Sequence, residues 1–148
     1  MQQKTIAEIR AFNRYYTGII GLLDRHILNS AFSLPEARIL YELSQREGVQ
    51  ASGIIESLGI DKGYLSRILE QFVTKKLIVR KRSAADGRLM HIYLTEKGRG
   101  AFEKLNRASD EQLKELLSGL SAADGEELSR HMTAITTILL KAQAAKEK

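Results

Sequence analysis

The segment from Asp61 to Gly98 limits the possible folds of this chain more than any other. It begins with Asp61, a favourable N-cap residue, and continues with apolar residues at helical spacing. Two β-prone stretches follow, residues 77–80 and 90–94, and Asp86-Gly87 between them favours a turn. The apolar face of the helix comprises Leu65, Ile68, Leu69, Phe72 and Val73. This order predicts a short capped helix that leads directly into a β-hairpin.

The same segment contains the excess positive charge of the chain. The 148 residues include 23 Lys and Arg against 18 Asp and Glu, which gives a net charge of +5. Between Asp61 and Arg88 there are eight basic and three acidic residues, so this stretch alone carries +5. The rest of the chain therefore contains equal numbers of basic and acidic residues. Localised positive charge favours an acidic partner such as nucleic acid, whereas evenly spread lysines serve mainly solubility.

A long helix is expected near the N-terminus. Apolar residues at a 3.6-residue period predict an amphipathic helix over residues 5–29, with Thr5 and Glu8 as a capping box. Its apolar surface is larger than one packed face requires. The excess favours packing against a second chain, but burial within its own domain is an equally good interpretation.

Two shorter helices are expected before Asp61. Ser33 and Glu36 form a capping box that opens a helix ending near residues 45–48. A second helix is expected from about residue 51 to 58, where Gly59 stands at the usual C-terminal glycine position. Two short helices joined by a tight turn with glycine indicate a helix-turn-helix, and a hairpin directly after it indicates a winged helix.

Helices are also expected after the hairpin. Thr95 is a good cap for a helix that continues to about Ser118, and Ser121 with Asp124 opens a final helix. The predicted fold class is therefore mainly α (α+β): a winged helix-turn-helix with a two-stranded β wing, flanked by long N- and C-terminal helices. The length fits one domain over residues 1–148.

Several functional classes are disfavoured. The chain has no cysteine, which removes disulfides and cysteine-based redox sensing. No apolar run approaches the ~20 residues that span a bilayer, and the polar first residues are unlike a signal peptide, so we expect a cytoplasmic protein without a membrane partner. His26, His91 and His131 are far apart, and no phosphate-binding or dinucleotide-binding motif is present. We therefore expect no metal, no cofactor and no enzymatic activity.

Five local motifs, in this order, resemble the MarR family of bacterial winged-helix transcriptional regulators. Leu58-Gly59-Ile60 and the run Leu65–Leu69 (LSRIL) are similar to the turn and recognition helix of that family. Leu77–Arg80 (LIVR) is similar to its first wing strand. Asp86-Gly87-Arg88, followed by Leu94–Gly98 (LTEKG), resembles its wing tip and the start of its next helix.

The resemblance implies an organisation and a set of partners. Residues 34–94 would form the DNA-binding lobe, while residues 5–29 and 95–145 would be dimerisation helices of a homodimer. A phenolic or anionic small molecule would enter a cleft between the two regions and release double-stranded DNA. The chain departs from the family pattern at Lys76, where a glycine is usual, and at Gln50, where a better capping residue is usual.

The first turns of a recognition helix enter the major groove, where Lys62, Gly63, Tyr64, Ser66 and Arg67 would be presented. The planar guanidinium of Arg67 suits bidentate contact with guanine or phosphate. On the wing, the candidate DNA contacts are Arg80, Lys81, Arg82 and Arg88. By resemblance, Arg88 is the residue inserted into a narrow minor groove, and Asp86 orients a wing arginine. The alternative for each is an ordinary solvated residue.

The expected function is that of a sequence-specific DNA-binding regulator, a repressor, whose homodimer reads a pseudo-palindromic operator. An aromatic effector cleft would be formed by Tyr15, Tyr16, Phe32 and Tyr41, although aromatic residues at helical spacing also serve simply as core. Two other functions stay open: a winged helix used only for protein contacts, and an enzyme whose residues converge only in space.

Overall fold

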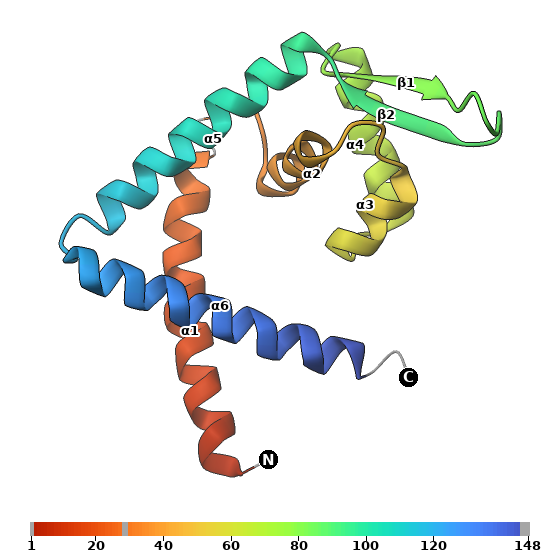
Figure 1. The fold of residues 1–148 in the computed structure, drawn as a ribbon. Coiled ribbons are helices and arrows are strands. Elements are labelled where there is room, and N and C mark those ends of the chain that lie inside the picture. The colour runs from red at the N-terminus through yellow and green to blue at the C-terminus, as the bar shows by residue number, and fades with distance from the viewer. Residues whose placement is uncertain (1, 28–29, 146–148) are drawn as a thin grey trace. The chain divides into compact units, whose positions relative to one another are not determined.

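The computed structural model describes residues 2–27 and 30–145, with side chains for all of these except 20–27. Figure 1 shows the order of the elements along the chain. They are α1 (Gln3–Ile27), α2 (Leu34–Gln45), α3 (Ala51–Leu58), α4 (Lys62–Thr74), β1 (Ile78–Arg82), β2 (Met90–Leu94), α5 (Glu96–Leu116) and α6 (Ala122–Ala144). This mainly helical fold with one two-stranded antiparallel sheet confirms the predicted winged helix-turn-helix.

The chain separates into two compact units, residues 1–112 and 113–148. In the first unit, α2, α3 and α4 lie together and the β1–β2 hairpin projects beside them (Figure 1). The hairpin pairs Ile78 with Leu94 at one end and Arg82 with Met90 at the other. Val49, in the loop before α3, forms a bridge to Ile92 and so ties the wing to the helices.

One apolar core holds these elements together. Phe72 of α4 is fully buried, and its ring meets that of Phe32 edge to face, with 6.2 Å between the centroids. Burial of such side chains is the main favourable term in folding, at roughly 25 cal/mol per Å² of apolar surface. The other buried apolar residues are Ile39, Leu40, Leu43, Ile54, Leu65, Ile68, Leu69, Leu77, Ile78, Ile92 and Leu105.

Most helix termini lie where the capping residues predict. Ser33 and Glu36 form the predicted reciprocal capping box of α2. Asp61 Oδ1 accepts a hydrogen bond of 2.8 Å from the Tyr64 backbone N–H. Gly59 ends α3 with φ +61°, a left-handed conformation that glycine adopts without cost. As the departure from the family pattern implied, the side chain of Gln50 makes no capping bond to α3.

The predicted start of the first helix is wrong. α1 begins at Gln3, so Thr5 lies inside the helix and is not its N-cap. The Thr5–Glu8 spacing therefore matches a capping box by coincidence. The predicted end of this helix at residue 29 lies outside the described residues.

A tight junction joins α4, β1 and α5. Lys76 adopts the left-handed conformation, with φ +58°, which is a strained backbone for a residue with a side chain. Thr95 stabilises this turn, because its hydroxyl donates to the Lys76 carbonyl O at 2.7 Å. Gly98 lies so close that a Cβ there would collide with the carbonyl O of Leu77. The Leu-Thr-x-x-Gly motif thus fixes the end of α4 against the start of α5.

Candidate nucleic-acid interface

The N-terminal half of α4 presents a cationic exposed face. Leu65, Ile68 and Leu69 turn into the core, which leaves Lys62, Gly63, Ser66 and Arg67 exposed on the other side. The free N–H groups and dipole of a helix N-terminus also favour a nearby phosphate. The structure therefore brings four of the five predicted recognition-helix residues to one solvent-facing surface.

Tyr64, the fifth, has a mixed role. Its side chain is half-buried and packs against the hydrophobic core. The Arg67 guanidinium carbon lies 5.9 Å from the centre of the Tyr64 ring, which is within cation–π range. The Tyr64 ring thus packs against the core on one side and contacts the exposed Arg67 guanidinium on the other.

The wing divides its basic residues between two faces. Successive side chains of a strand point to opposite faces, so Arg80 and Arg82 share the face of buried Ile92. Lys81 lies on the other face, with its Nζ 5.2 Å from the centre of the Tyr93 ring. The three predicted strand cations therefore do not form one cluster.

The wing tip is shaped by Asp86 and Ser83. Asp86 Oδ1 accepts a hydrogen bond of 3.0 Å from the backbone N–H of Arg88. The Ser83 hydroxyl accepts from the N–H groups of Ala85 and Asp86. Asp86 therefore positions Arg88 through the backbone, and the exposed guanidinium of Arg88 stays available at the tip. Among the described residues, Asp86 forms no ion pair with an arginine side chain.

Arg80 already has an acidic partner. Its Nη1 lies 2.8 Å from Oε1 of Glu70, ten residues earlier on α4, in a geometry that is both a hydrogen bond and an ion pair. Glu70 is absent from the predicted site because nothing local links it to residue 80. One signal was present: Glu70 is the only acid from residue 62 to residue 85.

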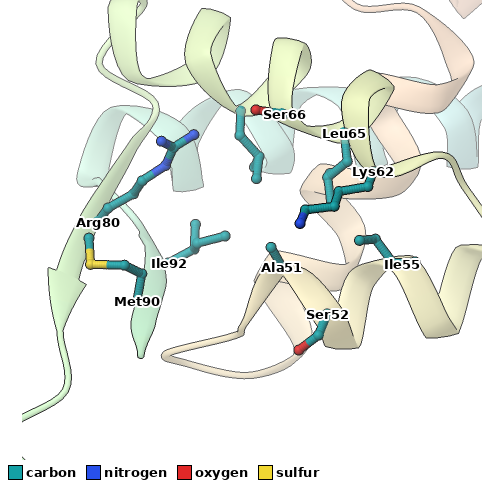
Figure 2. A pocket seen from close by; sticks show the side chains of 10 residues that line it. Ala51, Ser52, Ile55, Lys62, Leu65, Ser66, Arg80, Met90 and Ile92 are labelled. Carbon is teal, nitrogen blue, oxygen red and sulfur yellow. The ribbon is translucent and has the colours of Figure 1, made fainter. Parts of the chain in front are cut away.

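A pocket of about 440 Å³ lies between α3, α4 and the wing (Figure 2). Its floor is apolar, with Ile55, Leu65 and Ile92 among its walls. Lys62 and Arg80 bring positive charge to its lining from opposite sides, as Figure 2 shows. The pocket thus combines an apolar interior with cations directly beside the exposed face of α4.

The aromatic residues predicted to form an effector cleft are not brought together as a set. Phe32 lines a second pocket of about 560 Å³, together with Lys97 and Lys104 of α5. The Tyr16 ring stacks on Phe12 within α1, 5.4 Å between centroids, and Tyr15 is exposed. The half-exposed Tyr41 packs against Phe102. Only Phe32 of the four contributes to this pocket.

His91 and His131, the two histidines whose side chains the structure describes, make separate local contacts. Within residues 2–27 and 30–145, no cluster of three His, Asp or Glu side chains has a geometry that could hold a metal ion. His91 contacts the carbonyl O of Gly48 through Nδ1 at 2.7 Å, which ties the wing to the loop before α3. The His131 ring lies 3.5 Å from Glu127, one turn earlier on α6. In the same described part of the chain, no helix is long and apolar enough to cross a bilayer.

The chain is similar to known transcriptional regulators. The family model described as "MarR family" matches residues 32–89, from the loop before α2 to the wing tip. The HTH-type transcriptional regulator MgrA of Staphylococcus aureus is 29% identical over 121 residues, which cover 82% of this chain and 77% of MgrA.

Two solved structures share the fold. A mutant of MarR from E. coli has a TM-score of 0.75 at 20% identity and covers 86% of this chain and 94% of that one. FabT of Streptococcus pneumoniae, solved in complex with DNA, has a TM-score of 0.76 at 21% identity, with coverage of 90% and 98%. These two similarities concern the fold, whereas MgrA is a relative in sequence.

Proposed function

Since the chain belongs to the MarR family of winged-helix transcriptional regulators, we propose that it binds double-stranded DNA sequence-specifically as a homodimer. In this proposal α4 enters the major groove and the wing enters the minor groove, and the bound dimer acts as a repressor. The other two candidate functions, a protein-contact module and an enzyme, lack a supporting observation. The proposed place of action is the cytoplasm.

The observation that carries the proposal is the exposed cationic face at the start of α4. Lys62, Ser66 and Arg67 are exposed at the start of α4, and Gly63 leaves room for close approach of a duplex. Arg67 is the proposed base contact, because a guanidinium can bind both acceptors of guanine. Lys62, Tyr64 and Ser66 are proposed contacts to bases or phosphates.

The wing supplies the second contact in this proposal. Arg88 stands exposed at the tip of a turn whose shape Asp86 determines, which suits insertion into a narrow minor groove. Arg82 and Lys81 are proposed phosphate contacts on the two faces of the hairpin. Arg80 differs from the other predicted contacts because its guanidinium is bonded to Glu70. FabT, which has the same fold, was solved in complex with DNA.

Dimerisation is supported by apolar surface that one chain leaves uncovered. Among the described residues of α6, no side chain is buried, and Ile138 and Leu139 are 64% and 59% exposed. A symmetric homodimer would cover such surface and place two recognition helices on two half-sites about one helical turn apart. The proposed dimerisation regions are residues 5–29 and 95–145, flanking a DNA-binding lobe over residues 34–94.

Release by a small effector is proposed for the pocket lined by Phe32. Its wall joins an aromatic ring to Lys97 and Lys104, which suits an aromatic anion of the predicted phenolic or anionic class. Benzoate is a simple probe for this site. It is expected to raise the melting temperature of the wild-type protein and to have less effect on Lys104→Gln. Equal shifts for both proteins would locate benzoate elsewhere.

The test of the function is a binding comparison with natural and shuffled DNA. Fragments from the promoter region of the protein's own gene are compared with shuffled duplexes of equal length and composition, in a gel-shift series at rising salt. We expect one natural fragment to bind preferentially and all binding to weaken steeply as salt increases. Equal affinity for natural and shuffled duplexes would contradict sequence-specific regulation.

Substitution of the wing arginine tests the proposed minor-groove contact. We expect Arg88→Ala to weaken operator binding by about 1–3 kcal/mol while leaving the melting temperature unchanged, because the side chain is exposed. Anisotropy titrations measure the first quantity and thermal unfolding the second. Arg107→Ala, on the exposed surface of α5, is the matched control and should leave DNA binding unchanged. Unaltered affinity of Arg88→Ala would remove Arg88 from the interface.

A further inference from the structure

The ion pair between Glu70 and Arg80 links the two parts of the molecule that are proposed to read DNA. Oε1 of Glu70 lies on the third turn of α4, and Nη1 of Arg80, 2.8 Å away, extends from the middle of β1. The Arg80 side chain is 30% exposed and that of Glu70 is 63% exposed. The Glu70 carboxylate is therefore open to solvent, whereas the Arg80 guanidinium is partly enclosed.

The backbone that carries Glu70 and the backbone that carries Arg80 are both held in place by buried neighbours. Glu70 directly follows buried Leu69 and precedes buried Phe72 by two residues. Arg80 pairs in register with buried Ile92 across the hairpin. Surface ion pairs are usually weak because two long side chains must be ordered, and this cost falls when the core already holds both attachment points in place. Forming this ion pair therefore costs less side-chain ordering than forming a typical exposed ion pair.

The position of Glu70 is unfavourable for contact with DNA. It continues the row of Lys62 and Ser66 at a spacing of four residues along α4, so all three side chains share one side of the helix. A lone carboxylate beside phosphates is repelled by them. Arg80 is the nearby cation whose charge the carboxylate neutralises. The eight basic residues between Asp61 and Arg88 therefore include one whose charge is already balanced.

We infer that Glu70 is a specificity-determining residue that withholds Arg80 from the phosphate backbone. By holding the guanidinium against α4, it lowers the sequence-independent part of DNA binding and leaves the contacts of Arg67 and Arg88 untouched. The discrimination between operator and random DNA is then larger than it would be with a free Arg80. This inference rests on the proposed function and deepens it.

The inference predicts a measurable change in salt dependence. Each phosphate that a protein neutralises makes the slope of log K against log salt more negative by about 0.9 for duplex DNA. Glu70→Gln keeps the size of the side chain but removes its charge, which frees Arg80 for one phosphate. We expect the slope to become more negative by about 0.9 on random DNA, with a smaller ratio of operator to random affinity.

The experiment uses anisotropy titrations between about 50 and 200 mM salt, a range over which affinity that depends on phosphate contacts falls by orders of magnitude. Wild type, Glu70→Gln, Arg80→Gln and the double variant are titrated with operator and random duplexes. Glu103→Gln on α5 is the matched control, because it makes the same change in net charge at an exposed acid. Only Glu70→Gln should steepen the slope, and adding Arg80→Gln to it should abolish the gain.

Two failures are distinguishable. If wild-type protein binds DNA normally but Glu70→Gln leaves its slope and specificity ratio unchanged, this inference is overturned and the proposed function stands. The same holds if Glu103→Gln steepens the slope as much as Glu70→Gln, because the effect would then be one of net charge. If wild-type protein shows no salt-dependent DNA binding, the proposed function fails and this inference fails with it.

Discussion

The winged-helix region and helix α6 use apolar residues in opposite ways. Of the twelve buried apolar residues in the described chain, eleven lie between Ile39 and Ile92, and the twelfth is Leu105 of α5. Helix α6 contains six Leu, Ile and Met side chains but buries none of them. Its exposed residues include Met132, Ile135, Ile138, Leu139 and Leu140.

This difference indicates which part of the chain is stable without a second chain. A continuous core stabilises the surface proposed to read DNA from within, so we expect α4 and the wing to hold their shape without a second chain. Exposed apolar surface on α6 is unfavourable in water and is expected at an interface. Stability and assembly are therefore expected to respond to substitutions in different regions.

The largest expected effect is in the core. Phe72→Ala should lower the free energy of unfolding by about 3–5 kcal/mol, since it removes a fully buried ring and leaves a cavity. Val73→Ala is the adjacent control, and because Val73 is 39% exposed it should cost about 0.5 kcal/mol or less. Urea denaturation measures both. Similar losses for the two variants would contradict a core centred on Phe72.

A second prediction concerns the junction between α4 and α5. Gly98→Ala should destabilise the protein by about 1–3 kcal/mol, because the new methyl group would collide with the Leu77 carbonyl. Gly100→Ala, two residues later in the same helix, meets no atom within 4 Å and should stabilise by about 0.5–1 kcal/mol. Thermal unfolding of the pair checks the opposite signs. A stabilising Gly98→Ala would mean that the junction is not tight.

Local sequence signals explain how much of this region could be predicted. Capping residues bond to backbone groups only three or four positions away, so the helix ends that they define lie where the sequence predicts them. These residues are Ser33, Gly59, Asp61 and Ser121. The sequence predicts the first wing strand at residues 77–80, whereas the strand spans Ile78–Arg82. The difference arises because Leu77 belongs to the turn after α4 and the hairpin pairs as far as Arg82 with Met90.

Features that depend on tertiary structure could not be predicted in this way. The Glu70–Arg80 pair joins residues on different elements, and the half-burial of Tyr64 depends on packing around the turn. The two faces of the wing follow from strand alternation only once the pairing register is known. The candidate DNA contacts therefore stay predictions whose surroundings the structure now defines.

On α6, the expected effect is on assembly. Ile138→Ser combined with Leu139→Ser should raise the dissociation constant of the dimer at least about tenfold, which corresponds to about 1.4 kcal/mol, because the two side chains are largely exposed in one chain. Sedimentation at several concentrations measures this. Ala134→Ser on the same helix is the control. An unchanged dissociation constant in the double variant would place the interface elsewhere.

The smallest expected effect concerns the N-terminus of α6. Hydrogen bonds from the hydroxyl and the backbone N–H of Ser121 lower the pKa of the Asp124 carboxyl. Because the pKa is lower in the folded than in the unfolded state, this stabilisation is present at neutral pH and is lost as the pH falls through the folded-state pKa. Asp124→Asn should therefore show a smaller drop in melting temperature between pH 7 and acid than wild type. Glu126→Gln, with no such cap, should behave as wild type.

The number of chains bound to a single operator shows whether the protein reads DNA as a homodimer. Native mass spectrometry of the protein with one duplex, combined with titrations of duplexes that carry a half-turn insertion of about 5 bp between the half-sites, measures both pairing and geometry. Two chains per duplex are expected, with strong loss of affinity after the insertion, because it turns one half-site away from its recognition helix. One chain per duplex, bound equally well with and without the insertion, would contradict binding as a homodimer to two half-sites.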